Sequence, residues 1–169
     1  MNQFALWLAA TPPSVFIQEH NAWAIPAIQS VHIVGIALVM GSVLMIDLRI
    51  LGLAWTDHTL QQTTRRFGPW LTGSLWLLLA TGLLMVVGEP VRELVTFSFW
   101  LKMALVAIGA VVAVAFQRTV RRHEQHWQGT PSVKAMAVVT FLVWIGVIFL
   151  GRLIAYDHVW GSWSPAARL

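Results

Sequence analysis

Four long apolar stretches, separated by short polar segments, dominate the pattern of residues along this chain. We expect membrane spans at about residues 23–52, 68–88, 96–117 and 134–156. A helix needs roughly 20 apolar residues to cross the hydrocarbon core of a bilayer, and each stretch is long enough. The stretches are apolar on all sides, whereas a helix of a soluble bundle keeps a polar face. The pattern therefore predicts an all-α integral membrane protein, with one membrane domain built as a bundle of four transmembrane helices.

Residues 1–21 precede the first span and predict a short interfacial arm. No Lys or Arg precedes the apolar segment Phe4–Ala10, and Pro12-Pro13 stops it early, so it does not have the pattern of a secretory signal. Ser14 is a candidate N-cap for a second helical segment that runs toward His20. We expect the arm to lie at the membrane surface, and a frayed terminus is the alternative.

The basic residues are distributed unevenly among the connections between spans. The second connection has only Arg92, which Glu89 and Glu93 offset. Basic residues are concentrated in or beside the first and third connections: Arg49, Arg65, Arg66, Arg118, Arg121, Arg122 and Lys134. Positively charged connections stay on the cytoplasmic side of a membrane. We therefore expect an N-out/C-out topology, with both termini and the second connection on the outer side.

Composition narrows the possible functions. Of the 169 residues, 57% are hydrophobic and only 11% are charged, which leaves no room for a separate soluble catalytic domain. No nucleophile–base pair, carboxylate dyad or phosphate-binding loop is apparent, so the sequence argues against a stand-alone enzyme. The absence of Cys excludes disulfides, thiolate metal sites and iron–sulfur clusters. The net charge of +4 is an orientation signal, and we expect no nucleic-acid partner.

Three ionisable residues interrupt the apolar stretches, and they are the first candidates for function because such residues are costly inside a bilayer. His32 lies ~12 Å below the outer surface, and Lys102 lies ~8 Å into the outer half. Arg152 is ~27 Å from the inner surface, and Tyr156 follows one turn later on nearly the same face. A neutral imidazole can ligate haem iron or copper, or bond a quinone carbonyl. The alternatives are a histidine bonded to a hydroxyl or carbonyl of a neighbouring helix, and cations that snorkel outward.

Because these residues lie at one level, we expect a shared pocket in the outer leaflet. Two cations and an imidazole favour an anion: a haem propionate, a lipid phosphate, or the side chain of Glu89, Glu93 or Asp157. Internal salt bridging is the competing interpretation. The predicted cofactor-binding residues are His32, Lys102, Arg152 and Tyr156, and His32 is the predicted metal ligand.

Asp47 lies on nearly the same face of the first span as His32, but ~22 Å deeper. The two side chains therefore cannot touch. We expect Asp47 to pair with Arg49, Arg65 and Arg66 across the first connection, as a device for stability and orientation.

Several short motifs lie along the four spans: Ser30–Gly35 with Gly41, Asp47–Gly52, Arg66–Trp70, Thr81-Gly82, Phe99–Lys102 and Gly151–Tyr156. Together they resemble a family of small bacterial inner-membrane proteins known only as a domain of unknown function. The resemblance covers nearly the whole chain from Trp23 to Tyr156, and it implies that His32, Asp47, Arg49, Lys102 and Arg152 belong to one recurring design. The resemblance implies a location in the bacterial inner membrane.

Three classes of function remain open. The first is electron transfer, by a small b-type cytochrome with haem b or by a quinone-interacting protein that uses His32. Only one His lies inside a span, so a second axial ligand would come from His20 or His158 by a local fold-back, or from Met or Lys, or the haem would be five-coordinate. The second class is non-redox binding or transport of a small anion, metal or lipid. The third is a structural subunit that assembles with another membrane protein or with copies of itself.

Overall fold

The computed structural model describes residues 2–122 and 131–154, and every regular element in these ranges is a helix. Four helices are long and apolar enough to cross a membrane: α3 (Asn21–Leu51), α4 (Leu60–Gly88), α6 (Phe97–Arg122, of which Phe97–Phe116 qualifies) and α8 (Pro131–Ile154). Three short helices accompany them: α1 (Asn2–Ala9), α2 (Pro12–Glu19) and α5 (Pro90–Leu94). This confirms the predicted all-α class and its four candidate spans, whereas the sidedness of the termini stays a prediction.

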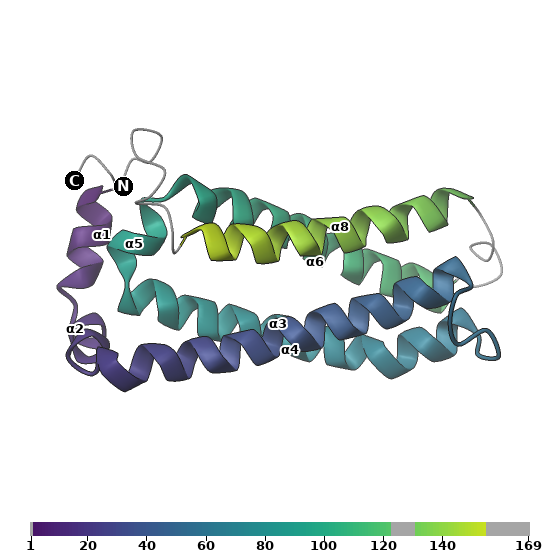
Figure 1. Ribbon diagram of the computed structural model, residues 1–169, viewed down its shortest axis with the longest axis horizontal. Helices are drawn as coiled ribbons and strands as arrows, with labels where there is room; N and C mark the ends of the chain where they lie inside the picture. Colours follow the sequence, from purple (N-terminus) through teal and green to yellow (C-terminus); the bar gives the residue numbers. More distant parts are fainter. Residues whose placement is uncertain (1, 123–130, 155–169) are drawn as a thin grey trace.

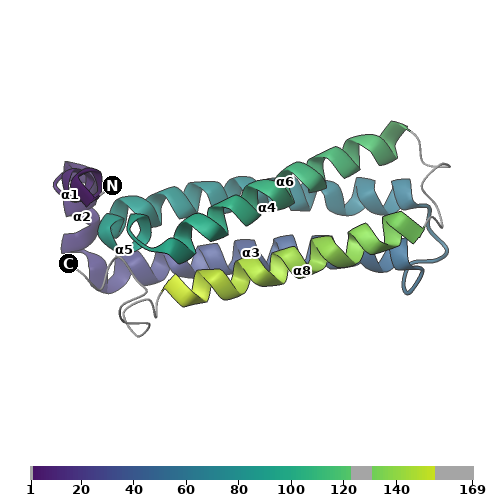
Figure 2. The same ribbon diagram turned by 90° about the horizontal axis from the view of Figure 1, so that it is seen from above.

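The four long helices lie side by side along one axis, and the short helices gather at one end (Figures 1 and 2). We call this the arm end, because it carries α1, α2 and α5. The opposite end carries the loop of residues 52–59 between α3 and α4, and we call it the loop end. The most extensive packing is between α3 and α4, followed by α6 with α8 and α3 with α8. Figure 1 shows that the two pairs lie closer together at the loop end than at the arm end.

Local sequence explains where α3 ends and α4 begins. Gly52 adopts a left-handed conformation (φ 74°), which ends α3, and Leu53 N–H bonds back to the carbonyl of Leu48 at 2.9 Å. Thr59 then caps α4: its hydroxyl accepts from Gln62 N–H, and the Gln62 side chain accepts from Thr59 N–H. The helix therefore begins before the expected span of residues 68–88, and Pro69 lies inside it.

The arm is folded against the bundle, and one expectation about it is wrong. Thr11, and not Ser14, is the extended residue that precedes α2, with Pro12 in the first turn. Ser14 is instead fully buried and accepts a hydrogen bond from Gln18 Nε2 at 2.7 Å. At Gly88 a Cβ atom would lie 2.9 Å from Ile17 of α2, so the glycine lets the arm pack closely onto the end of α4. This docking argues against a frayed terminus.

The core lies in the middle of the bundle and toward the loop end. All four long helices contribute buried side chains to it: Val39, Val43, Ile46, Leu71, Ala113, Trp144 and Val147. Gly35 of α3 touches α4 so closely that a Cβ there would lie 2.8 Å from Leu78 Cδ2. Gly109 of α6 similarly faces the Trp144 ring, 3.2 Å from such a Cβ. Small residues thus bring the helices together, as is typical of membrane bundles.

Candidate functional site

His32 is half-buried on α3, on the arm-end side of Gly35, and it is fixed by α4. Its Nδ1 lies 2.7 Å from the Thr81 hydroxyl, which itself donates to the carbonyl of Leu77 at 2.7 Å. A hydroxyl has only one proton, so the Thr81 oxygen must accept from His32 Nδ1–H. In the neutral ring Nε2 then carries the free lone pair, and this nitrogen is the one that can accept a proton or ligate a metal.

Small residues on both helices make this contact possible. Gly35 lies one turn from His32 and allows α3 to approach α4 closely. Gly82 lies beside the imidazole, where a Cβ atom would be 3.8 Å from His32 Cε1, an ordinary contact distance. The close helix pair therefore places the His32 ring against Thr81, with Gly82 beside it.

Lys102 reaches the same region from α6. Its side chain packs against α8, where a Cβ atom on Gly151 would lie 3.4 Å from Lys102 Nζ. The ammonium group interacts electrostatically with both His32 and Glu93. Lys102 is therefore half-buried between helices, which differs from the alternative of a lysine that snorkels freely outward.

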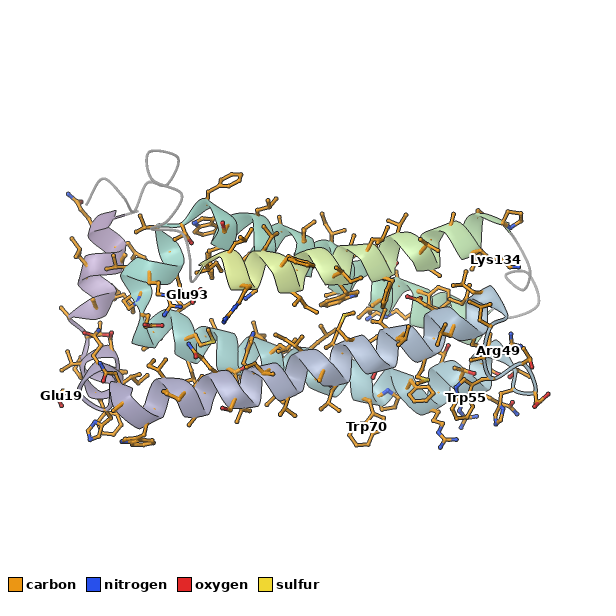
Figure 3. All side chains as sticks on the ribbon, viewed as in Figure 1. Glu19, Arg49, Trp55, Trp70, Glu93 and Lys134 are labelled. Carbon is orange, nitrogen blue, oxygen red and sulfur yellow. The ribbon has the colours of Figure 1, made fainter. Side chains whose placement is uncertain are left out.

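Glu93 is the anion that the structure places near Lys102. It belongs to the short helix α5 and only 4% of it is exposed (Figure 3). Burial raises the pKa of Glu93, the positive charges of Lys102 and Arg92 lower it, and Glu89 raises it. Glu93 and Lys102 do not form a direct salt bridge, whereas the more exposed Arg92 and Glu89 pair at 2.7 Å.

The roles of the other predicted site residues stay predictions. Arg152 follows Gly151 on α8, next to the contact between that glycine and Lys102. Tyr156 and Asp157 lie outside the described residues. The structure thus brings together His32, Lys102 and Glu93, and it adds Thr81, which the sequence had marked only as part of a Thr-Gly motif. The hydroxyl partner expected in the alternative interpretation of His32 is therefore present.

The arrangement offers one oriented imidazole, one ammonium donor and one buried carboxyl group. Within residues 2–122 and 131–154, no group of three or more His, Cys, Asp or Glu side chains could enclose a metal ion. His32 alone could supply one axial ligand to a metal that a cofactor brings with it. The predicted role of His32 as a metal ligand stays a prediction.

The expectation for the loop end is wrong. Asp47 does not pair with the neighbouring arginines: it is buried, and its Oδ2 has no hydrogen-bond partner. Arg49 Nε instead donates to the carbonyl of His58 at 2.6 Å. The Arg66 guanidinium lies over the Trp55 ring, 5.3 Å from its centroid. Figure 3 shows Arg49 and Trp55 at this end of the bundle.

Comparison with known proteins identifies the family but no activity. A search of curated proteins and a search of solved structures each found no match. A family model, described as "Family of unknown function (DUF6644)", matches residues 21–157, which include all four long helices and the His32, Lys102 and Asp47 positions. The chain therefore belongs to this family of unknown function.

Proposed function

We propose that the arm-end site binds the head group of a membrane quinone, in a small electron-transfer protein of the bacterial inner membrane. The observation that carries the proposal is the hydrogen bond from His32 Nδ1–H to Thr81, which leaves the lone pair of Nε2 free. An imidazole held in one tautomer within a membrane span is a positioned proton acceptor. A quinol hydroxyl is a suitable donor to this nitrogen, and a lipid-soluble quinone reaches this depth through the bilayer.

The charges around His32 favour a neutral guest over an anionic one. Lys102 interacts with the buried carboxyl of Glu93, so its positive charge already has a partner within the protein. A haem brings two propionates, and Glu93 would repel them, whereas a quinone is neutral and offers two carbonyl acceptors. In this proposal the Lys102 ammonium donates to a quinone oxygen, and His32 Nε2 accepts from the reduced form.

Haem b is the second candidate, and the same hydrogen bond supports it. Histidines that ligate a metal generally donate their other ring N–H to a fixed acceptor, which orients the ring. Here Thr81 is that acceptor, and His32 Nε2 would hold the haem iron. Arg152 and Tyr156 are the candidate partners of the propionates. No second histidine lies in the described part of a span, which ranks haem below quinone.

The orientation that we propose follows from the basic residues. Arg49, Arg65, Arg66, Arg118 and Lys134 all belong to the loop-end half of their helices, as the element bounds indicate. Under the positive-inside rule the loop end faces the cytoplasm. The arm end, with the His32 site, then faces the periplasm.

The test is binding of a short-chain ubiquinone or menaquinone analogue to the purified protein in lipid nanodiscs. The chain has ten Trp, so saturable quenching of their fluorescence is the readout. We expect His32→Ala to weaken binding about tenfold or more, because a bond to an ionisable group is lost. His32→Gln keeps a donor for Thr81 and serves as a second variant that preserves the helix contact.

A matched control is His20→Ala, since the His20 ring bonds only to the carbonyl of its own helical segment at Phe16. This variant should bind the quinone as the wild type does. An absorption spectrum of the same sample is the discriminating measurement: a Soret band that His32→Ala removes would assign haem instead. If the protein shows no saturable quenching and no Soret band, the redox proposal is overturned. Retained lipid in native mass spectrometry would then point to non-redox lipid binding.

A further inference from the structure

A small cavity lies at the loop end of the bundle, next to Asp47. Its volume is about 30 Å³, and side chains of all four long helices line it, including Leu71 of α4, Phe116 of α6 and Thr140 of α8. A cavity of this size holds about one water molecule or one small ion. The site is therefore large enough for a guest much smaller than a cofactor.

The cavity contains one carboxyl group that lacks a partner. Asp47 is 7% exposed, and its Oδ2 makes no hydrogen bond. Thr140 carries the only other side-chain oxygen in the lining, and its hydroxyl donates to the carbonyl of Met136 at 2.9 Å. Because its proton is used there, the Thr140 oxygen can act toward the cavity only as an acceptor. Two oxygen acceptors thus lie on the wall of one otherwise apolar chamber.

No neighbouring group neutralises Asp47. The lining from α4, α6 and α8 has no titratable side chain. Among the basic residues that follow Asp47 along the chain, Arg49 donates to the His58 carbonyl, Arg66 lies over the Trp55 ring, and Arg65 is exposed. Lys134 lies at the start of α8 and is exposed. Since a bare carboxylate in an apolar membrane interior is strongly unfavourable, a cationic guest is needed to balance it.

We propose that Asp47, Thr140 and this cavity form an exchangeable site for one monovalent cation, either a proton carried on the carboxyl group or a sodium ion between the two side-chain oxygens. The guest enters from the loop end, because Asp47 is only about 8 Å along the helix from the end of α3 at Gly52. The apolar core residues Val39 and Val43 separate the site from His32. The proposal therefore does not depend on quinone binding.

Infrared difference spectroscopy of the protein in lipid nanodiscs tests this proposal. Acid titration in choline chloride should develop one carboxylic-acid C=O band that Asp47→Asn lacks and Glu93→Gln retains. Replacing choline with sodium at equal ionic strength should move the midpoint of this band to lower pH, by about one unit per tenfold rise in sodium at saturation. Thr140→Val should weaken this sodium effect about tenfold, because one oxygen ligand is lost.

The other possible results distinguish a proton from a sodium ion at this site, or show that no cation binds there. A band that Asp47→Asn removes, without a sodium effect, assigns the proton alone. No such band, together with a sodium-dependent thermal unfolding temperature that Thr140→Val abolishes, assigns sodium. The absence of both a band that Asp47→Asn removes and any sodium dependence of unfolding in the wild type overturns the proposal. The sodium dependence of wild-type unfolding does not depend on whether Asp47→Asn folds.

Discussion

The two ends of the bundle place an ionisable residue on nearly the same face of α3, but they treat it differently. At the arm end His32 is bonded to Thr81 and interacts with Lys102 from another helix. At the loop end Asp47 has an oxygen with no partner, although three arginines follow nearby in the sequence. One residue is positioned by its neighbours, and the other is left facing a cavity. The comparison shows that oppositely charged residues can lie near each other in the sequence without forming an ion pair in the folded protein.

The difference has a packing cause. At the arm end glycines let one helix touch another, as Gly35 does against Leu78 and Gly151 does against Lys102. Polar groups on adjoining helices therefore come within bonding distance. Around Asp47 the other helices present larger side chains such as Leu71 and Phe116, and a gap remains between them. Close contact between helices thus orients the histidine at the arm end, whereas larger side chains leave a cavity at the loop end.

The largest expected effect comes from Gly35→Leu, which would break the close contact that positions His32. A Cβ at Gly35 already lies 2.8 Å from Leu78 Cδ2, so a leucine must displace the Leu78 side chain or move α3 away from α4. We expect a loss of about 3 kcal/mol in the free energy of unfolding, together with weaker quinone binding. Thermal unfolding in mild detergent and Trp quenching measure the two effects.

Gly41→Leu is the matched control, because it lies on the same helix and no atom lies within 4 Å of a Cβ there. Its effect on stability should stay within about 0.5 kcal/mol. Equal effects of the two variants would show that the arm-end site does not depend on close packing of α3 against α4.

The next effect is that of Thr81→Val, which removes the acceptor for His32 Nδ1–H but keeps the shape of the side chain. We expect a cost of about 2 kcal/mol, because the histidine donor is left without its partner inside the bundle. Quinone binding should weaken about tenfold, because the ring is then free to rotate. Thr81→Ser retains the hydroxyl and should bind as the wild type does. If both variants bind equally, Thr81 does not orient the histidine.

The sequence predicts the fold better than it predicts the site. Apolar stretches of sufficient length are a strong local signal, so the four long helices could be placed from residues alone. His32 and Lys102 could be grouped by their depth, which follows from the rise of a helix. Thr81 and the partnerless Asp47 could not be found in this way, because they depend on the rotation of each helix about its axis. That rotation is set by contacts such as the one between Gly35 and Leu78.

A smaller effect on stability is expected from substituting two adjacent buried threonines on α4, which differ in their hydrogen bonding. Thr63 Oγ1 donates to the carbonyl of Thr59 at 3.2 Å, whereas Thr64 Oγ1 has no partner and is fully buried. Thr63→Val should lower the free energy of unfolding by about 1 kcal/mol. Thr64→Val should raise it by up to about 1 kcal/mol, because it removes an unsatisfied hydroxyl. Thermal unfolding of both variants gives the signs, and a loss of stability in Thr64→Val would mean that its hydroxyl has a partner.

The smallest expected effect is the pH dependence that Glu93 contributes at the arm end, because opposing causes act on it. Burial raises the pKa of Glu93 above its ordinary value of 4.5, and Lys102 and Arg92 partly offset this. The folded protein therefore holds the proton at a pH where the unfolded chain has released it. The Glu93 contribution to the free energy of unfolding therefore falls as pH rises from 4.5 through the raised pKa of the folded protein. Below pH 4.5 this loss of stability is absent.

Glu93→Gln, which cannot ionise, should therefore equal the wild type in acid and become the more stable of the two as pH rises. Thermal unfolding across this pH range measures the divergence. A constant difference between Glu93→Gln and the wild type at all pH values would show that Glu93 has the same pKa in the folded and unfolded states. A wild type that gains stability over the variant as pH rises would instead show that Lys102 outweighs burial. The arm end would then resemble an ordinary ion pair, and the contrast with the partnerless carboxyl of Asp47 would be sharper.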